Sequence, residues 1–248
     1  GHAISSNTIS GSSDTGIRLS ADTVTIHDNM ISDASWGINI FATSSNSDAI
    51  PTNHIISNNI ISGSYSQGIY LHPYADGNTI TSNTIKDGRY AGITISASNN
   101  NIISQNIIDN NKPESKCSEA GGCQSFAMKL HASNNNNIYD NQITNNRLGI
   151  LLHSSNDNTL TSNTINNNIG NGINLKWGTG NVLVDNIANF NEGYGYIIEG
   201  DSSVSGVPDV FTGNTATGNT VSDFEGVSAD SSMSVGTLNI GGSDGGDC

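Results

Sequence analysis

An internal repeat restricts the fold of this chain more than any other feature of its sequence. Each copy carries the motif Asn-x-Ile, which reads Asn-Ile-Ala in the last copy, and the motif begins at Asn7, Asn29, Asn59, Asn83, Asn106, Asn141, Asn163 and Asn186. The spacings between these asparagines are 22, 30, 24, 23, 35, 22 and 23 residues. The period is therefore about 23 residues, and some copies contain insertions.

A second motif, Gly-Ile-x-Φ with an apolar residue at Φ, follows these asparagines. Six copies keep it, at residues 16–19, 37–40, 68–71, 92–95, 149–152 and 172–175, and two copies carry variants, at 127–130 and 195–198. A unit of this length cannot bury its apolar edge alone, whereas stacked copies share one continuous core. Leucine-rich repeats have a similar period, but the leucine pattern and the helical segment that they need are missing from this sequence.

The composition favours short strands joined by tight turns. Asn, Ser, Thr, Gly and Ile dominate, and charged residues make up only 12% of the chain, which is too few for ordinary helical surfaces. An asparagine at one place in every copy tolerates left-handed backbone geometry, and its amide can hydrogen-bond along the stack. We therefore predict an all-β fold, a single right-handed parallel β-helix of about nine coils.

The repeat also predicts where the domain begins and ends. The β-helix is expected to span residues 1–226, followed by a C-terminal cap or tail at 227–248. Insertions at about 43–53, 112–124 and 200–210 interrupt the period and are expected to shape a binding surface on one side of the stack. The N-terminus starts in the middle of a copy, so we expect a longer parent chain, or self-association in which a neighbouring subunit covers the exposed strand edges.

The charge and the cysteines indicate an extracellular protein. The formal charge is −14, which argues against nucleic acid or an anionic membrane as the main partner. No apolar run reaches the roughly 18 residues that a membrane span needs, so a secreted or cell-surface location without membrane insertion is expected. Cys117 and Cys123 bracket a short turn and are predicted to form a disulfide in an oxidising compartment. Cys248 is then either a free thiol or a cross-link to another chain.

The stretches Gly-Ile-x-Φ-x should place two columns of side chains on the outer face of one sheet, because alternate residues of a strand point to opposite faces. The first column reads Arg18, Asn39, Tyr70, Thr94, Lys129, Leu151, Asn174 and Ile197, and the second reads Ser20, Phe41, His72, Ser96, His131, His153, Lys176 and Glu199. Although the chain has only 8 Lys and Arg and 6 His, six of these residues fall in the two columns. Basic side chains are thus concentrated on one face of an acidic protein, and His131 and His153 are expected to touch.

The two motifs resemble those of the parallel β-helix repeat families, which include pectate-lyase-like proteins, mannuronan C5-epimerases and the carbohydrate-binding repeats of microbial surface proteins. The resemblance covers about residues 4–222 and implies a polysaccharide partner. The chain departs from the epimerases at their motif Asp-Pro-His, because it has Leu71-His72-Pro73 instead. His72 is a positional counterpart, and the role of the acid is unfilled.

A lyase or C5-epimerase that acts on a uronate needs a base for the proton α to the carboxylate, an acid, and a cation for the developing enolate. Histidine and lysine can supply these roles. The predicted catalytic residues are His131, His153, Lys129, Lys176 and His72, and the predicted substrate-binding residues are Arg18, Tyr70, Tyr74, Trp177 and Asn174. An anionic substrate is compatible with the acidic chain, because charges farther away than a Debye length of ~8 Å are screened.

Other functions stay open at this stage. A non-catalytic surface, sheath-like or carbohydrate-binding protein would use the same fold, with the basic column as tolerated decoration. A glycoside hydrolase ranks lower, because Asp140, Asp185 and Glu199 are scattered rather than clustered. A metal site is not predicted, since His72 lies two coils from His131. No cofactor is required, although calcium binding through Asp-rich turns is compatible with the sequence.

Overall fold

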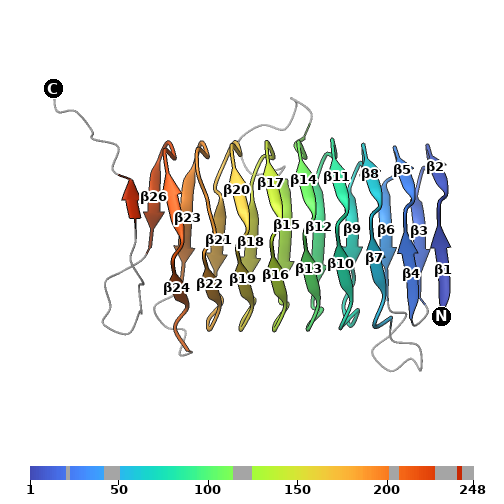
Figure 1. Cartoon of the computed structure of the whole chain (residues 1–248), viewed down its shortest axis with the longest axis horizontal. Helices are drawn as coiled ribbons and strands as arrows, with labels where there is room; N and C mark the ends of the chain where they lie inside the picture. Colours follow the sequence, from blue (N-terminus) through green and yellow to red (C-terminus); the bar gives the residue numbers. More distant parts are fainter. Residues whose placement is uncertain (21–22, 42–50, 114–124, 201–206, 227–238, 242–248) are drawn as a thin grey trace.

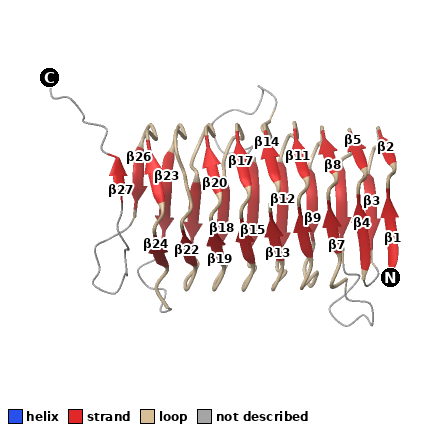
Figure 2. Ribbon diagram, viewed as in Figure 1, coloured by secondary structure: helices blue, strands red, loops and turns tan. Residues whose placement is uncertain are grey.

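Every regular element of the structure is a β-strand. The computed structural model describes residues 1–20, 23–41, 51–113, 125–200, 207–226 and 239–241, and these residues form strands β1 to β27 without a helix. Figure 1 shows the strands stacked in sequence order along the long axis of the molecule, and Figure 2 shows only strands and connecting loops. The predicted all-β solenoid is confirmed.

Two parallel sheets of nine strands run along the stack. Sheet A contains β1 (His2–Ser5), β4 (Val24–His27), β7 (Ile55–Ser57), β10 (Thr79–Thr81), β13 (Ile102–Ser104), β16 (Asn137–Tyr139), β19 (Thr159–Thr161), β22 (Val182–Val184) and β24 (Val210–Thr212). Sheet C contains β3 (Thr15–Leu19), β6 (Trp36–Ile40), β9 (Gln67–Leu71), β12 (Ala91–Ser96), β15 (Phe126–His131), β18 (Ile150–His153), β21 (Ile173–Lys176), β23 (Tyr194–Glu199) and β26 (Ser222–Glu225).

Sheet B is the third parallel sheet. It contains β2 (Thr8–Ser10), β5 (Met30–Ser32), β8 (Ile60–Ser62), β11 (Thr84–Lys86), β14 (Ile107–Asp109), β17 (Gln142–Thr144) and β20 (Thr164–Asn166). Single bridges from Thr164 through Ile187 to Thr215 continue it to β25 (Thr215–Thr217), which pairs with β27 (Asn239–Gly241). Each complete coil therefore passes through sheets A, B and C in turn, and β27 adds a strand within the segment predicted as a cap or tail.

Aliphatic side chains, mainly isoleucine, fill the space between the three sheets. The inward residues at the centre of successive sheet B strands are Ile31, Ile61, Ile85, Ile108, Ile143 and Ile165, and each is at most 1% exposed. In sheet C the two apolar residues of each Gly-Ile-x-Φ motif point inward, as Ile93 and Ile95 do. Stacked copies thus share one core, as the repeat predicts.

The asparagines of the Asn-x-Ile motif form a ladder at the corner between sheets A and B. The side-chain amide of Asn83 donates to Oδ1 of Asn106 at 3.0 Å, and Asn106 donates to Oδ1 of Asn141 at 3.0 Å. The predicted hydrogen bonding along the stack is confirmed. The predicted left-handed geometry of these asparagines is wrong, because the positive φ belongs to the preceding residue of each corner, such as Gln105 (φ 56°) or Asp140 (φ 55°). That residue turns the chain, and the asparagine after it points inward.

Two further polar ladders at the other corners are not predicted by the motif. One runs through Asn78, Asn101, Asn136, Asn158 and Asn181 to Asp209, and the other through Asn111, Asn146, Asn168, Asn191 and Asn219 to Asp223. All three corners of the solenoid are therefore held by buried side-chain amides, so the register of the three sheets is coupled from coil to coil.

The glycine of Gly-Ile-x-Φ is required by close stacking of the backbone. A Cβ added at Gly149 would lie 2.1 Å from the carbonyl oxygen of Gly172 and 2.6 Å from Cγ2 of Ile165. We expect Gly149→Ala to lower the free energy of unfolding by about 1–3 kcal/mol, because a backbone atom within a ladder cannot move aside. Thermal unfolding measures this loss. Gly200→Ala is the control, since nothing lies within 4 Å of its added Cβ, and equal losses in both variants would contradict the stacking explanation.

Several predictions fall outside the described residues. The Cys117–Cys123 disulfide, Cys248, and most of the three predicted insertions belong to this group. Among the residues that the structure describes, no helix has the length and apolar character needed to cross a membrane.

Candidate functional site

The outer face of sheet C carries the two predicted columns in the predicted register. In the second column His131 pairs with His153, and His153 pairs with Lys176 on the next strand. The first column, one residue per strand from β3 to β23, reads Arg18, Asn39, Tyr70, Thr94, Lys129, Leu151, Asn174 and Ile197. Residues far apart in the sequence therefore lie side by side on one face.

Four basic side chains of these columns, Lys129, His131, His153 and Lys176, form a basic cluster on β15, β18 and β21. The rings of His131 and His153 stack with centroids 5.0 Å apart and an interplanar angle of 25°, so the predicted contact is confirmed. Nζ of Lys176 lies 2.8 Å from Oε2 of Glu199 on the following strand. The cluster therefore combines two adjacent imidazoles with a lysine that is already paired with a carboxylate.

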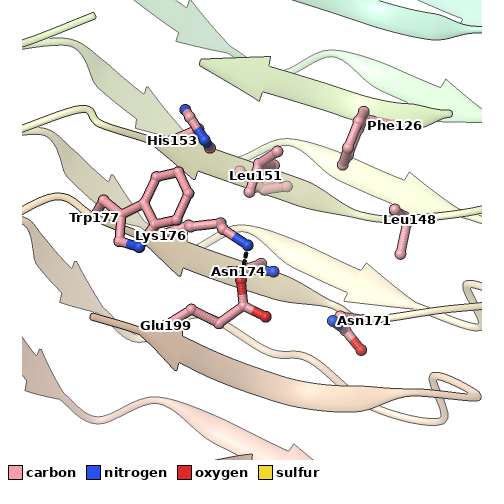
Figure 3. A pocket seen from close by; sticks show the side chains of 10 residues that line it. Phe126, Leu148, Leu151, His153, Asn171, Asn174, Lys176, Trp177 and Glu199 are labelled. Carbon is pink, nitrogen blue, oxygen red and sulfur yellow. Dashed lines mark ion pairs between the residues drawn. The ribbon is translucent and has the colours of Figure 1, made fainter. Parts of the chain in front are cut away.

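A pocket of about 440 Å³ lies beside this cluster (Figure 3). Its lining residues are Phe126, Leu148, Ile150, Leu151, His153, Asn171, Asn174, Lys176, Trp177 and Glu199. Leu151 and Phe126 are largely buried and give the pocket an apolar surface. The polar groups converge on one side, where the Lys176–Glu199 pair meets Asn174, whose buried Oδ1 accepts no hydrogen bond from any described residue. An apolar surface with a few convergent polar groups is typical of a binding site for an organic ligand.

Trp177 forms the aromatic side of this pocket. Its ring centroid lies 4.9 Å from that of His153, and Nζ of Lys176 lies 4.8 Å from the centre of the Trp177 ring. Its backbone has a φ of 56°, whereas the same turn in preceding coils has the small residues Ala132 and Ser154. A left-handed conformation is costly for a bulky side chain, and such costs concentrate at functional sites. The turn therefore holds an indole ring, half exposed, over the basic cluster.

The electrostatic environment keeps His153 neutral near pH 7. Burial lowers the pKa of His153 below its ordinary value of 6.5, and the positive charges of His131, Lys129 and Lys176 lower the pKa further. Glu199 acts in the opposite direction and raises the pKa of His153. A neutral imidazole in a pocket can accept a proton, so His153 has the protonation state that a general base needs.

This balance of charges predicts the titration of His153. In the unaltered chain we expect an NMR titration of its ring protons to give a pKa below 6.5. His131→Gln should raise that pKa, because it removes a neighbouring positive charge, whereas Glu199→Gln should lower it, because it removes a negative one. A pKa of His153 at or above 6.5 in the unaltered chain, or shifts of the opposite sign in the two variants, would contradict this description.

The other predicted site residues, Arg18, Tyr70, His72 and Tyr74, lie nearer the N-terminus. Three of them form a separate aromatic cluster with two further column residues, and this cluster consists of Arg18, Asn39, Phe41, Tyr70 and His72. The ring of His72 lies 3.8 Å from that of Tyr70 and 6.4 Å from that of Phe41, between centroids. The guanidinium of Arg18 lies 4.0 Å from the centre of the Phe41 ring. Burial, and then the charge of Arg18, lower the pKa of His72.

His72 is not brought to the pocket. Going along the second column, Ser96 and His131 separate it from His153, so the distance is three strand spacings, about 14 Å. His72 therefore cannot contact the same sugar carbon as His153. Tyr74, with a φ of 71° and a half-exposed ring, lies in the turn after His72 and belongs to the same end of the face.

Sequence reasoning missed several residues of the pocket. Glu199 was placed in the second column without a role, although the register makes it the neighbour of Lys176. Phe126, Leu148 and Asn171 each come directly before the motif. Phe126 opens strand β15, whereas Leu148 and Asn171 lie before β18 and β21, at the entry to sheet C, where alternation of faces gives no guidance. Their shared position just before the motif is the signal that could have identified them.

The described part of the chain contains no group of three or more His, Cys, Asp or Glu side chains placed to hold a metal ion. Within that part of the chain, the stacked pair His131 and His153 has Lys129 and Lys176 beside it.

Comparison with solved structures shows the same fold in enzymes of very different sequence. The periplasmic alginate epimerase AlgG matches with a TM-score of 0.72 at 21% identity, over 87% of this chain and 50% of that chain. Pectate lyase Pel9A matches with a TM-score of 0.68 at 11% identity, over 99% of this chain and 72% of that chain. The A-module of the Azotobacter vinelandii mannuronan C-5 epimerase AlgE4 matches with a TM-score of 0.55 at 13% identity, over 95% and 76% of the two chains.

The chain spans about half the length of the alginate epimerase structure that it matches. Two comparisons of sequence give different results. A search of curated protein sequences found no significant match. The family model described as the right-handed beta helix region matches residues 45–221, which is more than half of the chain. This agrees with the stacked parallel sheets and the repeated motifs, and the chain belongs to the right-handed beta helix family.

Proposed function

We propose that this protein binds an acidic, uronate-containing polysaccharide on the outer face of sheet C and acts on it as a lyase or a C5-epimerase at the pocket around His153. The observation that carries the proposal is a pocket that His153 lines together with Lys176 from the next strand, and the lowered pKa of His153 supports it. The similar folds of alginate epimerases and a pectate lyase support the kind of substrate.

In the proposed reaction His153 removes the proton from the carbon next to the uronate carboxylate. The C–H bond breaks and the proton moves to the imidazole. The electron pair of the broken bond is delocalised into the carboxylate, which becomes an enolate. Lys176 neutralises the charge that develops there. In a lyase the electron pair then expels the oxygen at the neighbouring carbon, which takes up a proton from water, and a carbon–carbon double bond is left. In an epimerase the C–H bond forms again with a proton that water delivers from the opposite face.

The other pocket residues have roles that follow from their positions. Trp177 offers a ring face for the C–H side of a sugar. Asn174 offers an unpartnered carbonyl oxygen for a sugar hydroxyl. Glu199 holds Lys176 at 2.8 Å, in the place where a substrate carboxylate would bind, so an entering uronate competes with Glu199 for the ammonium group.

A glycoside hydrolase fits this pocket less well. Hydrolysis of a glycosidic bond ordinarily uses two carboxyl groups that flank the bond. Among the described residues that line the pocket, Glu199 is the sole carboxylate, and it is paired with Lys176. A non-catalytic polysaccharide-binding protein is the second candidate. It is favoured by one observation, namely that Glu199, the sole acidic side chain among the described residues that line the pocket, is paired with Lys176 and so is not free to act as the second proton donor.

We also propose that the protein works outside the cytoplasm. The net charge of −14 and the very low content of Lys and Arg suit an exported protein whose polysaccharide partner is extracellular. One of the structures with a similar fold is described as periplasmic.

The test of the proposed function is an assay on a panel of alginates, pectates and glycosaminoglycans, each with calcium and with a chelator. Ultraviolet absorbance detects the unsaturated product of a lyase, and NMR detects epimerisation. We expect product from at least one polymer and a large loss in Lys176→Met, whereas Lys86→Met, on the exposed face of sheet B, should keep full activity. If no polymer gives product but one of them binds tightly, the protein is a polysaccharide-binding protein rather than an enzyme.

A further inference from the structure

Three buried polar atoms on or directly after the neighbouring strands β6, β9 and β12 of sheet C have no hydrogen-bond partner among the described residues. They are Oδ1 of Asn39, Nε2 of His72 and Oγ1 of Thr94. Asn39 is 5% exposed and Thr94 is 6% exposed, so both side chains are more than nine-tenths buried. Most buried polar groups in folded proteins have a partner, and an unpartnered group calls for an explanation. Three such atoms on neighbouring strands of one outer face indicate a binding site in which a ligand supplies the missing hydrogen-bond partners.

The surroundings of these atoms are aromatic. Tyr70 stands between Asn39 and Thr94 in the register of the sheet, one strand from each. Its ring lies against that of His72, at 3.8 Å between centroids. Phe41 and Arg18 close the N-terminal side, with the guanidinium stacked on the ring. The strands are fixed by their neighbours, so the partly buried Tyr70 ring, which lies against His72, is the side chain that must move for a ligand to reach the three atoms.

The chemistry of the three atoms defines the ligand. An amide oxygen accepts a hydrogen bond, a threonine hydroxyl donates or accepts, and a neutral imidazole nitrogen does either according to its tautomer. None of them carries a charge. Arg18 lies at the N-terminal edge over Phe41, and Lys129 is the neighbour of Thr94 on the next strand, toward the basic cluster. Hydroxyl groups together with an apolar ring face, as a sugar presents them, match this set, whereas a carboxylate matches the basic cluster around His153 and Lys176.

We propose that the aromatic cluster together with Thr94 is a second saccharide site that binds the hydroxyl groups of a sugar in the same polysaccharide chain, remote from the sugar that reacts at His153. The inference rests on the proposed function, since it assumes a polysaccharide on this face. His72 and His153 are three strand spacings apart, about 14 Å, and Ser96 and His131 lie between them in the second column. A substrate must therefore be long enough to reach both, and short oligosaccharides occupy the pocket alone.

The experiment compares Thr94→Val with Thr79→Val, a matched threonine on the outer face of sheet A, in a His153→Ala background that cannot turn the substrate over. Calorimetry gives the Kd for oligosaccharides of increasing length. We expect affinity to rise with length until both sites are filled, and Thr94→Val to weaken the long oligosaccharides by about tenfold and the short ones not at all. Thr79→Val should change neither.

Stability separates a ligand site from a structural role. Thr94→Val removes an unpartnered buried hydroxyl, so the melting temperature should stay the same or rise while affinity falls. A lower melting temperature with unchanged affinity would overturn the inference. So would equal weakening of short and long oligosaccharides, and in that case the proposed function would still stand if product forms.

The ring protons of His72 report on the second site directly. In the chain with a native His153, we expect their NMR signals to shift when a long oligosaccharide is added, and not with a short one. If no polymer gives product but the His72 signals shift with a neutral or acidic oligosaccharide, the second site stands and the proposed catalysis fails. If product forms and the His72 signals stay in place at saturation, catalysis stands and the second site is wrong.

Discussion

Replacing His153 with alanine is expected to lower kcat/KM on the acidic polysaccharide by about 10²- to 10⁴-fold, the usual loss when a general base is removed. His153 is the histidine that lines the pocket, and burial together with neighbouring positive charges keeps it neutral. Lys176, which would hold the substrate carboxylate, is its partner on the next strand. Initial rates of product formation, measured from the absorbance of the unsaturated sugar or from NMR, give the loss.

His131→Ala is the matched control for this prediction, because His131 stacks on His153 but does not line the pocket. We expect a smaller loss and a different pH profile. The rate should fall as the pH drops through the pKa of His153, below 6.5 in the unaltered chain. Without His131 that pKa rises, so the acidic limb moves to higher pH. Equal losses in the two variants with identical profiles would assign the base to the pair rather than to His153.

His27→Ala provides a second control on a different sheet of the solenoid. His27 lies on β4 in sheet A, where it contacts Asp28 at 2.7 Å. It has the same side chain in a place far from the pocket, so its removal should leave the rate unchanged. A loss in His27→Ala as large as that in His153→Ala would point to a general effect on folding rather than on proton transfer.

The arrangement of the basic cluster could be predicted because the motif fixes which residues point outward. In Gly-Ile-x-Φ-x the apolar residues must face the core, so the register of sheet C follows once the glycines are aligned. The contact between His131 and His153 and the order of Lys176 and Glu199 agree with this alignment. The close approach that makes the glycine necessary recurs in the coils that carry it, so it preserves the alignment across insertions of different length.

The walls of the pocket could not be predicted in this way. Leu148 and Asn171 lie at a corner between sheets, where the chain follows no fixed alternation. The orientation of Trp177 depends on a positive φ that its residue type disfavours, and only the stacking of neighbouring coils imposes it. The division of the face into a basic and an aromatic cluster is likewise a result of side-chain packing, because both lie in the same two columns.

The ladder through Asn136 shows why composition alone does not identify which asparagines point inward. Residues 134–137 are four consecutive asparagines, and the sequence does not distinguish the one that turns inward. In the structure Asn135 has a φ of 55°, Asn136 is 1% exposed, and Asn137 opens a strand with its side chain exposed. Adjacent residues of the same type therefore have opposite roles, one structural and one at the surface.

The neighbours Asn136 and Asn137 give the prediction with the largest expected change in the free energy of unfolding. Asn136 accepts hydrogen bonds at Oδ1 from the backbone and the side chain of Asn101, at 2.9 and 3.0 Å, and its own amide donates to Asn158 at 3.0 Å. Asn136→Ala leaves buried donors of Asn101 without an acceptor, at a cost of about 1–3 kcal/mol for each group. We expect the free energy of unfolding to fall by about 3–5 kcal/mol in total, near the upper end for a single substitution.

Asn137→Ala is the control for Asn136→Ala, because it removes the same atoms one residue later on the exposed face of β16. A surface substitution of this kind should change the free energy of unfolding by no more than about 0.5 kcal/mol. Denaturant unfolding followed by circular dichroism measures both variants, with the slope of the transition as a check that the same surface is exposed. Similar losses in the two variants would show that the ladder at this corner adds little, and that the stacked isoleucines alone hold the coils in register.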